Sequence, residues 1–271
     1  MTTTTVPPRA DAGGAPVTQL RVVKSEWIKF WSLRSTTVTL VVTVLLLVGV
    51  GLIASSVFGN GDTGGPGDDG PQNPIDVSLA GLNLAQLALA TLGVLFMAGE
   101  YSTGMIRSSL AAVPKRLPVL WAKIAVFTGV SFVVGLLASA IAFTGGQAII
   151  GDLGASWSDP GVVRAVVGTA VVLAGFGLFG VALGTLLRST PAAISTIVGV
   201  MFLLPGIAGL LLPDSWGDNV TQVLPPNAAE AFTDITRNEG TLSPWAGLAV
   251  FAAYLVATTL AAAWRLRRTD A

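Results

Sequence analysis

The chain has 271 residues, of which 52% are hydrophobic and only 11% charged, and its 15 basic and 15 acidic side chains leave no net charge. Soluble domains average about 25% charged residues, so this composition excludes an ordinary soluble globular protein. The absence of Cys and His excludes disulfides, thiolate and serine–histidine catalysis, and most zinc sites.

Two segments precede the first long apolar run. Residues 1–17 are rich in Thr, Pro, Ala and Gly without an apolar period, which predicts a disordered tail. From Thr18 onward, apolar residues recur at helical spacing and basic or hydroxyl residues fall largely opposite them. This pattern predicts an amphipathic helix in the membrane interface, acting as an anchor or as a contact for a partner. Its apolar residues are Leu20, Val23, Trp27, Phe30 and Trp31.

Six apolar runs follow, each of which is long enough to cross about 30 Å of hydrocarbon as a helix. The predicted spans cover residues 38–58, 77–99, 119–145, 162–187, 191–212 and 245–264. The segment 213–244 between the last two spans includes a stretch from Asn227 that is compatible with a short helix returning toward the bilayer.

The basic residues are distributed asymmetrically about these spans. Thirteen of the fifteen Lys and Arg residues lie in or beside the two tails and the second and fourth connections. Only Arg164 and Arg237 lie in or beside the first, third and fifth connections. The positive-inside rule therefore places both termini in the cytoplasm. Because the basic residues flank spans, nothing in the sequence indicates a nucleic-acid partner. Lys123 and Arg164 lie near span ends, where their long side chains are expected to snorkel to the interface.

The second span carries two polar residues, Asn83 and Gln86, one helical turn apart. Polar groups in hydrocarbon are satisfied against neighbouring helices or in a wet cavity. These two residues are therefore predicted either to hydrogen-bond between helices or to line a transport path.

The cytoplasmic segment 99–118 carries the most functional information in the sequence. Ser102 or Thr103 is placed to cap a two-turn helix that ends before Pro114. Met105, Ile106 and Leu110 give this helix an apolar face. The face is compatible with docking into a cleft of a soluble partner and equally with resting on lipid.

Two glycine patterns favour packing over chemistry. Residues 175–180 match G-x-G-x-x-G but lie within a span, where Gly180 and Gly184 form a small-xxx-small pair for close helix contact. No G-x-x-x-x-G-K-[ST] occurs, so any ATP must be bound by another chain.

In the fifth span, Pro205 predicts a kink, with a flexing gate as the alternative.

Three segments resemble permease subunits of the type-two ABC exporter family, as found in actinobacteria. Residues 25–36 (SEWIKFWSLRST) are similar to the N-terminal signature of these subunits, and residues 224–228 (LPPNA) are similar to the outer segment before the last span. Residues 99–107, with Leu110, Pro114, Arg116 and Lys123, resemble the first cytoplasmic loop, although the family usually has threonine in place of Met105.

The resemblance implies an all-α polytopic protein of the bacterial plasma membrane. It would have six transmembrane helices, an N-terminal amphipathic elbow helix and both termini in the cytoplasm. Its partners would be two ATPase subunits, which bind ATP and Mg, and a second permease copy or paralogue; this chain itself would hold no cofactor. The elbow helix would include Glu26, Trp27, Lys29, Trp31 and Arg34. The helix docking into the ATPase would comprise Glu100, Tyr101, Ser102, Thr103, Gly104, Met105, Ile106 and Arg107, with Glu100 orienting it.

The sequence thus predicts the transmembrane subunit of an ATP-driven exporter rather than an enzyme. Its almost uniformly apolar spans favour a lipophilic cargo such as a drug or a lipid. One alternative is a non-transporting partner, such as an immunity or assembly subunit with the same architecture. A membrane-embedded enzyme is disfavoured because the chain has no His or Cys and no acid in the middle of an apolar run.

Overall fold

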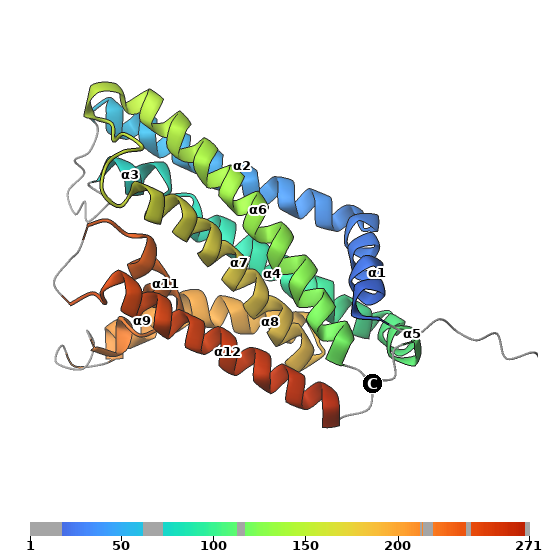
Figure 1. Cartoon of the computed structure of the whole chain (residues 1–271). Helices are drawn as coiled ribbons and strands as arrows, with labels where there is room; N and C mark the ends of the chain where they lie inside the picture. The colour runs from blue at the N-terminus through green and yellow to red at the C-terminus, as the bar shows by residue number, and fades with distance from the viewer. Residues whose placement is uncertain are drawn as a thin grey trace, which may run out of the picture.

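A computed structural model describes residues 18–61, 73–112, 117–211, 213, 219–236 and 240–268. The predicted tail, residues 1–17, lies outside this part of the chain. Within the described ranges the regular structure is entirely helical (Figure 1). The elements are α1 (Gln19–Ser32), α2 (Arg34–Gly59), α3 (Pro74–Ser78), α4 (Leu82–Ser102), α5 (Met105–Ala112), α6 (Leu117–Ile150), the 3₁₀ turn η1 (Gly151–Leu153), α7 (Val162–Leu187), α8 (Thr190–Val198), the π-helical η2 (Gly199–Leu203), α9 (Leu204–Leu211), α11 (Pro225–Thr233) and α12 (Pro244–Arg268).

Six of the helical segments are long and apolar enough to cross a membrane, which confirms the predicted number of spans. They are Arg34–Gly59, Leu82–Ser102, Leu117–Leu153, Val162–Leu187, Thr190–Leu211 and Pro244–Arg268. The second span begins at Leu82 rather than near residue 77, because α3 forms a separate short helix before it. Asn73 starts α3 by accepting a hydrogen bond from the Ile75 amide (2.9 Å).

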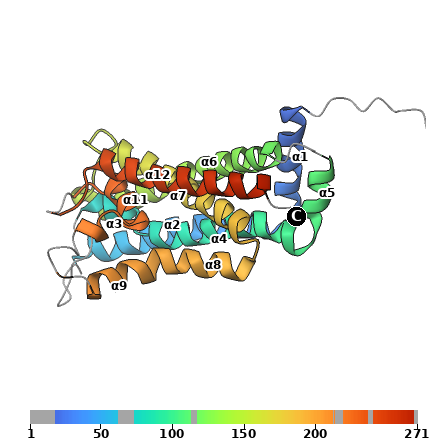
Figure 2. The same cartoon turned by 90° about the horizontal axis from the view of Figure 1, so that it is seen from below.

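Helix α7 is the centre of the bundle and packs against α4, α6 and α12 (Figures 1 and 2). In the bundle, 83% of the most apolar stretch of α7 is buried, against 17% for the fifth span, which α8, η2 and α9 form. Figure 2 shows α8 and α9 along one side of the bundle. The fifth span therefore presents most of its apolar surface outward.

The close contact between α4 and α7 depends on glycines. A Cβ on Gly180 would lie 2.0 Å from the Ala90 carbonyl oxygen, and one on Gly93 would lie 2.2 Å from the carbonyl oxygen of Gly177. The predicted packing role of Gly180 and Gly184 is confirmed, since both approach the backbone of α4. Because glycine has no side chain, the two backbones can approach closely. Such close packing is how helices associate in lipid, which supplies no hydrophobic driving force between them.

The fifth span does not break at Pro205, which lies inside α9. Proline cannot donate a backbone hydrogen bond and crowds the preceding turn. The wide turn of η2 comes immediately before it, with the Leu204 amide bonded to the Gly199 carbonyl. This local π-helix accommodates the proline within a continuous span.

Helix α1 lies across one end of the bundle, near α5 and the described end of α12 (Figure 1). We refer to this end as the α5 end, and to the opposite end, which carries α3 and α11, as the α11 end. The crosswise position of α1 agrees with the predicted interfacial helix. By the distribution of basic residues, the α5 end is the one predicted to face the cytoplasm.

The tight approach of α4 and α7 gives a test. We expect Gly180→Ala to destabilise the protein by about 1–3 kcal/mol, because the added methyl overlaps the Ala90 carbonyl. The measurement is the midpoint of thermal unfolding in detergent. Gly129→Ala on α6 is the matched control, since no described atom lies within 4 Å of the added Cβ. Equal loss of stability in both variants would contradict the packing role.

Candidate functional site

The ends of α1, α4 and α6 meet at the α5 end of the bundle around four charged side chains. Glu26 and Lys29 come from α1, Glu100 from the last turns of α4, and Lys123 from the second turn of α6. Helix α5 follows α4 after only Thr103 and Gly104. The cluster therefore lies at the base of the predicted docking helix.

The four side chains form one ion-pair network. Lys123 Nζ lies 2.7 Å from Glu26 Oε2 and 2.8 Å from Glu100 Oε1. Lys29 Nζ lies 2.8 Å from Glu26 Oε1 and 3.3 Å from the same Glu100 Oε1. Two lysines thus alternate with two glutamates, and every positive charge contacts both negative ones. We refer to these residues as the α1–α4–α6 network.

The network is buried most deeply at Lys123. The side chain of Lys123 is 0% exposed and that of Glu26 is 2% exposed, whereas Lys29 at the edge retains 27%. Removing a charge from water costs several kcal/mol, which only close pairing with opposite charge offsets. Burial lowers the pKa of Lys29, but the hydrogen bond and charge of Glu26 and the charge of Glu100 outweigh it, so the pKa is raised.

Aromatic rings pack against the buried side of the network. Phe30, Phe96 and Phe127 contact one another with ring centroids 5.3–6.0 Å apart. Lys123 Nζ lies 4.3 Å from the centroid of the Phe96 ring, so its charge also meets the negative face of an aromatic ring. In this dry setting each ion pair is stronger than it would be at the surface.

The ion pairs of the network link three helices to one another. Glu100 is bound to Lys123 of α6 and to Lys29 of α1, so α4 cannot shift at this point without moving both neighbours. Glu100 Oε2 is buried and finds no hydrogen-bond partner among the described residues. Among the described residues, no group of three or more acidic, His or Cys residues is placed to hold a metal ion.

The sequence-predicted elbow residues divide between two faces of α1. Glu26 and Lys29 enter the network, while Trp27 and Trp31 remain about half exposed and contact each other edge to face at 5.9 Å. Arg34 is exposed at the first residue of α2. The structure thus separates an ion-pairing face from an aromatic face suited to the lipid interface.

The predicted capping of the docking helix is wrong. The hydroxyls of Ser102 and Thr103 donate back to the Gly99 carbonyl at 3.0 and 2.9 Å, so they end α4 and do not cap α5. Gly104 then turns the chain with φ 72°, a left-handed conformation that glycine adopts without strain.

The remaining residues of the predicted docking segment have separate surroundings. Ile106 is buried in the main apolar core, and Met105 is half exposed. Tyr101 lies beneath the Arg188 guanidinium, 5.2 Å from ring centroid to Cζ. The side chain of Arg107 lies outside the described part of the structure.

Asn83 and Gln86, predicted either to hydrogen-bond between helices or to line a transport path, are bonded to each other in the described structure. Gln86 Nε2 donates to Asn83 Oδ1 of the same helix at 2.8 Å. The pair lies in the first turns of α4, with Asn83 exposed and Gln86 buried. This i, i+3 pair links the two side chains within one helix.

Sequence reasoning missed Lys123 and Arg164. Lys123 does not snorkel, because it is fully buried between two glutamates. Arg164 donates to the main-chain carbonyls of Phe232 and Asp234, the second at 2.9 Å, and so fixes the end of α11. The signal available for Lys123 was a lysine at the fifth position of the predicted span 119–145, together with glutamates beside two other spans that had no assigned partner.

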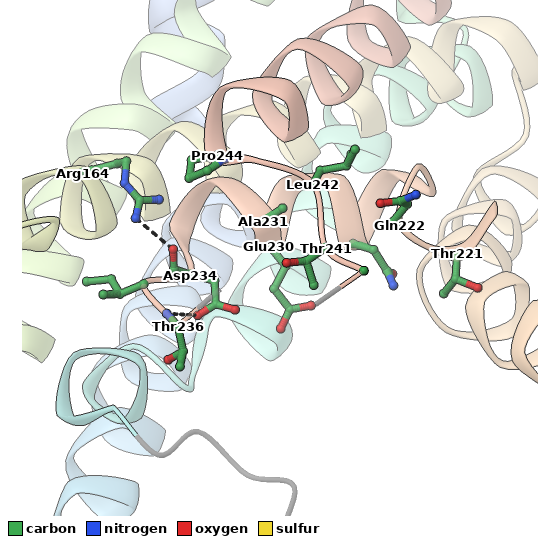
Figure 3. A pocket seen from close by; sticks show the side chains of 13 residues that line it. Arg164, Thr221, Gln222, Glu230, Ala231, Asp234, Thr236, Thr241, Leu242 and Pro244 are labelled. Atoms are coloured by element: carbon green, nitrogen blue, oxygen red, sulfur yellow. Dashed lines mark hydrogen bonds between the residues drawn. The ribbon is translucent and has the colours of Figure 1, made fainter. Parts of the chain in front are cut away.

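A second polar region, a cavity of about 570 Å³, lies at the α11 end (Figure 3). Its walls come from α11, the connection to α12 and the start of α7, and they include Arg164, Gln222, Asn227, Glu230, Asp234 and Thr241. Two acids and an arginine that is engaged with carbonyls give this cavity a polar lining unlike the apolar faces of the bundle.

No protein-family model and no curated protein matches the chain significantly. What is established is a multi-pass, all-helical membrane protein with a buried ion-pair network at one end.

The network predicts that losing Lys123 is severe. Lys123→Met leaves Glu26 and Glu100 with only the partly exposed Lys29 between them, and we expect a loss of about 3–5 kcal/mol. Thermal unfolding in detergent measures the loss. Lys24→Met on the exposed side of α1 is the control and should leave the unfolding midpoint unchanged.

A compensating variant separates charge from packing. Adding Glu26→Gln and Glu100→Gln to Lys123→Met removes the unpaired charges, so we expect most of the stability to return. If the triple variant is as unstable as Lys123→Met alone, the deficit comes from lost packing and the electrostatic account is wrong.

Proposed function

We propose that this chain is the transmembrane permease subunit of an ATP-driven exporter. It would form a substrate path with a second permease copy or paralogue. Two separate ATPase subunits, which bind ATP and Mg²⁺, would drive transport. The observation that carries the proposal is the α1–α4–α6 network at the base of α5, because it ties a short exposed helix to three elements of the bundle.

Helix α5 has the properties of a coupling element. It is eight residues long, and Ile106 anchors it to the core while Met105 remains available on its surface. The left-handed turn at Gly104 sets its direction relative to α4. A partner that holds α5 would therefore control its orientation from outside the membrane.

The network supplies a route for that motion. A displacement of α5 reaches α4 through the two-residue turn, and Glu100 lies at the end of α4. From Glu100 the displacement would be transmitted to α6 through Lys123 and to α1 through Lys29. Buried pairs of this geometry resist separation, so the three helices would move together.

The proposed energy source lies in another polypeptide. The sequence contains no phosphate-binding loop of the G-x-x-x-x-G-K-[ST] type. A chain with an apolar bundle and a docking helix needs a soluble nucleotide-binding partner to do work, which is the division of labour that the resemblance of residues 25–36 and 99–107 implies.

Purification from the native membrane tests the proposal. We expect the tagged chain to bring down an ATPase that carries Walker motifs, and its ATPase activity to respond to the presence of the chain in nanodiscs. Recovery of the folded chain with no nucleotide-binding partner would favour a non-transporting membrane subunit. Recovery of a partner whose activity ignores the chain would also contradict a coupled permease.

Gly104 gives a sharper test of coupling. We expect Gly104→Ala to reduce the ATPase response and transport severalfold while leaving insertion intact, because a Cβ at φ 72° costs roughly 1–2 kcal/mol and turns α5 away. We expect the same outcome for Arg107→Ala. Gly99→Ala is the matched control, since this glycine is helical and its added Cβ meets no described atom within 4 Å. Normal coupling in the Gly104 and Arg107 variants would contradict the role of α5.

A further inference from the structure

Two aspartates from distant parts of the sequence meet at the α11 end. Asp76 belongs to α3, and Asp234 directly follows α11. Their carboxyl groups lie within hydrogen-bonding reach of each other. Thr236 Oγ1 donates to Asp76 Oδ2 at 3.0 Å. The Thr236 amide donates to Asp234 Oδ1 at 3.1 Å (Figure 3). The contact therefore joins α3 to the connection between α11 and α12.

Each side of this contact is attached to a different long helix. Gln147 of α6 holds α3, donating to the Pro74 carbonyl at 2.8 Å and to Ser78 Oγ at 2.7 Å. Arg164 of α7 holds the other side through the carbonyls of Phe232 and Asp234. The Asp76–Asp234 contact thus links an α6-bound segment to an α7-bound segment.

Hydrogen bonding between two carboxyl groups requires a proton, because two carboxylates have only acceptors and repel each other. The surroundings favour this protonated form. Burial, followed by the charge and hydrogen bond of Asp234, outweighs the opposing hydrogen bonds from Thr236 and the Ile235 amide and raises the pKa of Asp76 from 3.8 to about 7. Desolvation in the cavity wall, with the charge of Asp234, also raises the pKa of Glu230.

Among the described residues, the neighbouring helices form no ion pair with either carboxyl group. The described charged groups near the pair are Glu230 of α11 and Arg164 of α7, and the Arg164 guanidinium binds main-chain carbonyls. Helices α2 and α6, which pack on α3, carry only Arg34 and Lys123, both at the α5 end. One shared proton is the simplest way to keep the contact closed.

We propose that Asp76 and Asp234 form a proton-controlled latch, which fastens α3 to the α11–α12 connection while the pair holds one proton and opens when the pair loses it. Opening releases that proton to the solvent and leaves two carboxylates that repel; closing takes one proton up. By the predicted orientation, the proton comes from the external medium. The latch does not depend on the chain being an exporter.

The direction of the pH effect follows from the raised pKa. A carboxyl group that binds its proton more tightly in the closed form stabilises that form at low pH. The stabilisation is complete below the ordinary value of 3.8 and is lost as pH rises through about 7. The latch is therefore closed in acid and opens in mildly alkaline medium.

Hydrogen exchange of the full chain in nanodiscs tests the latch. The Ile235 amide, which bonds to Asp76, is the direct reporter. Asp76→Asn is the reference, because its amide donates to Asp234 at every pH and its oxygen still accepts. The ratio of wild-type to Asp76→Asn exchange cancels the intrinsic effect of pH. From about pH 5.5 to about pH 8.5 we expect this ratio to start near one and rise above pH 7, by at most about tenfold per pH unit.

Three further variants complete the test. Asp152→Asn, which alters an exposed acid of η1, should keep the wild-type rise. Asp76→Ala should exchange faster than Asp76→Asn at every pH, because it has no side-chain partner for Asp234. Asp234→Asn should suppress the rise like Asp76→Asn, and it serves as the reference if that variant does not fold. A flat wild-type ratio, loss of the rise in Asp152→Asn, or identical exchange in Asp76→Ala and Asp76→Asn would overturn the proposal.

Discussion

A lysine with no exposed surface, held between two glutamates, is the interaction on which the α5 end depends. Lys123 cannot remain charged in an apolar bundle without Glu26 and Glu100, and these acids cannot remain there without a cation. This mutual requirement brings α1 onto the bundle and fixes its rotation, since Glu26 must point inward. With that rotation set, Trp27 and Trp31 face outward to the interface. One buried charge thus determines the position of a helix that the membrane alone would leave free to rotate.

The two ends of the bundle use electrostatics in opposite ways. At the α5 end, opposite charges alternate and stabilise one another directly. At the α11 end, two aspartates meet, and in our proposal their contact lasts only while they share a proton. Between the ends, α7 packs closely on α4 through Gly93, Gly177 and Gly180. The closely packed centre thus lies between two ends that are held together by different kinds of electrostatic contact.

Most of the fold could be predicted from the sequence, because membrane spans are a local property. A run of about 20 apolar residues must form a helix in lipid, where every backbone polar group needs an internal partner. That rule located six spans, and the glycines at 180 and 184 indicated a close helix contact that the structure confirms. It failed at the start of the second span, because α3, which Asn73 and Pro74 start, extends over residues 77 and 78 that hydropathy assigned to that span.

The candidate site was predicted only in part. Glu26, Lys29 and Glu100 were identified as residues of the elbow and docking segments, but Lys123 was assigned to the interface. Pairing of Lys123 with Glu26 joins residues 97 positions apart, and the Thr236–Asp76 bond joins residues 160 apart. The sequence by itself determined the number of spans, the amphipathic α1 and the charge asymmetry, because these follow from hydrophobicity and spacing along one segment. Only the tertiary structure decided which charges are buried together, because that depends on which faces of distant helices meet.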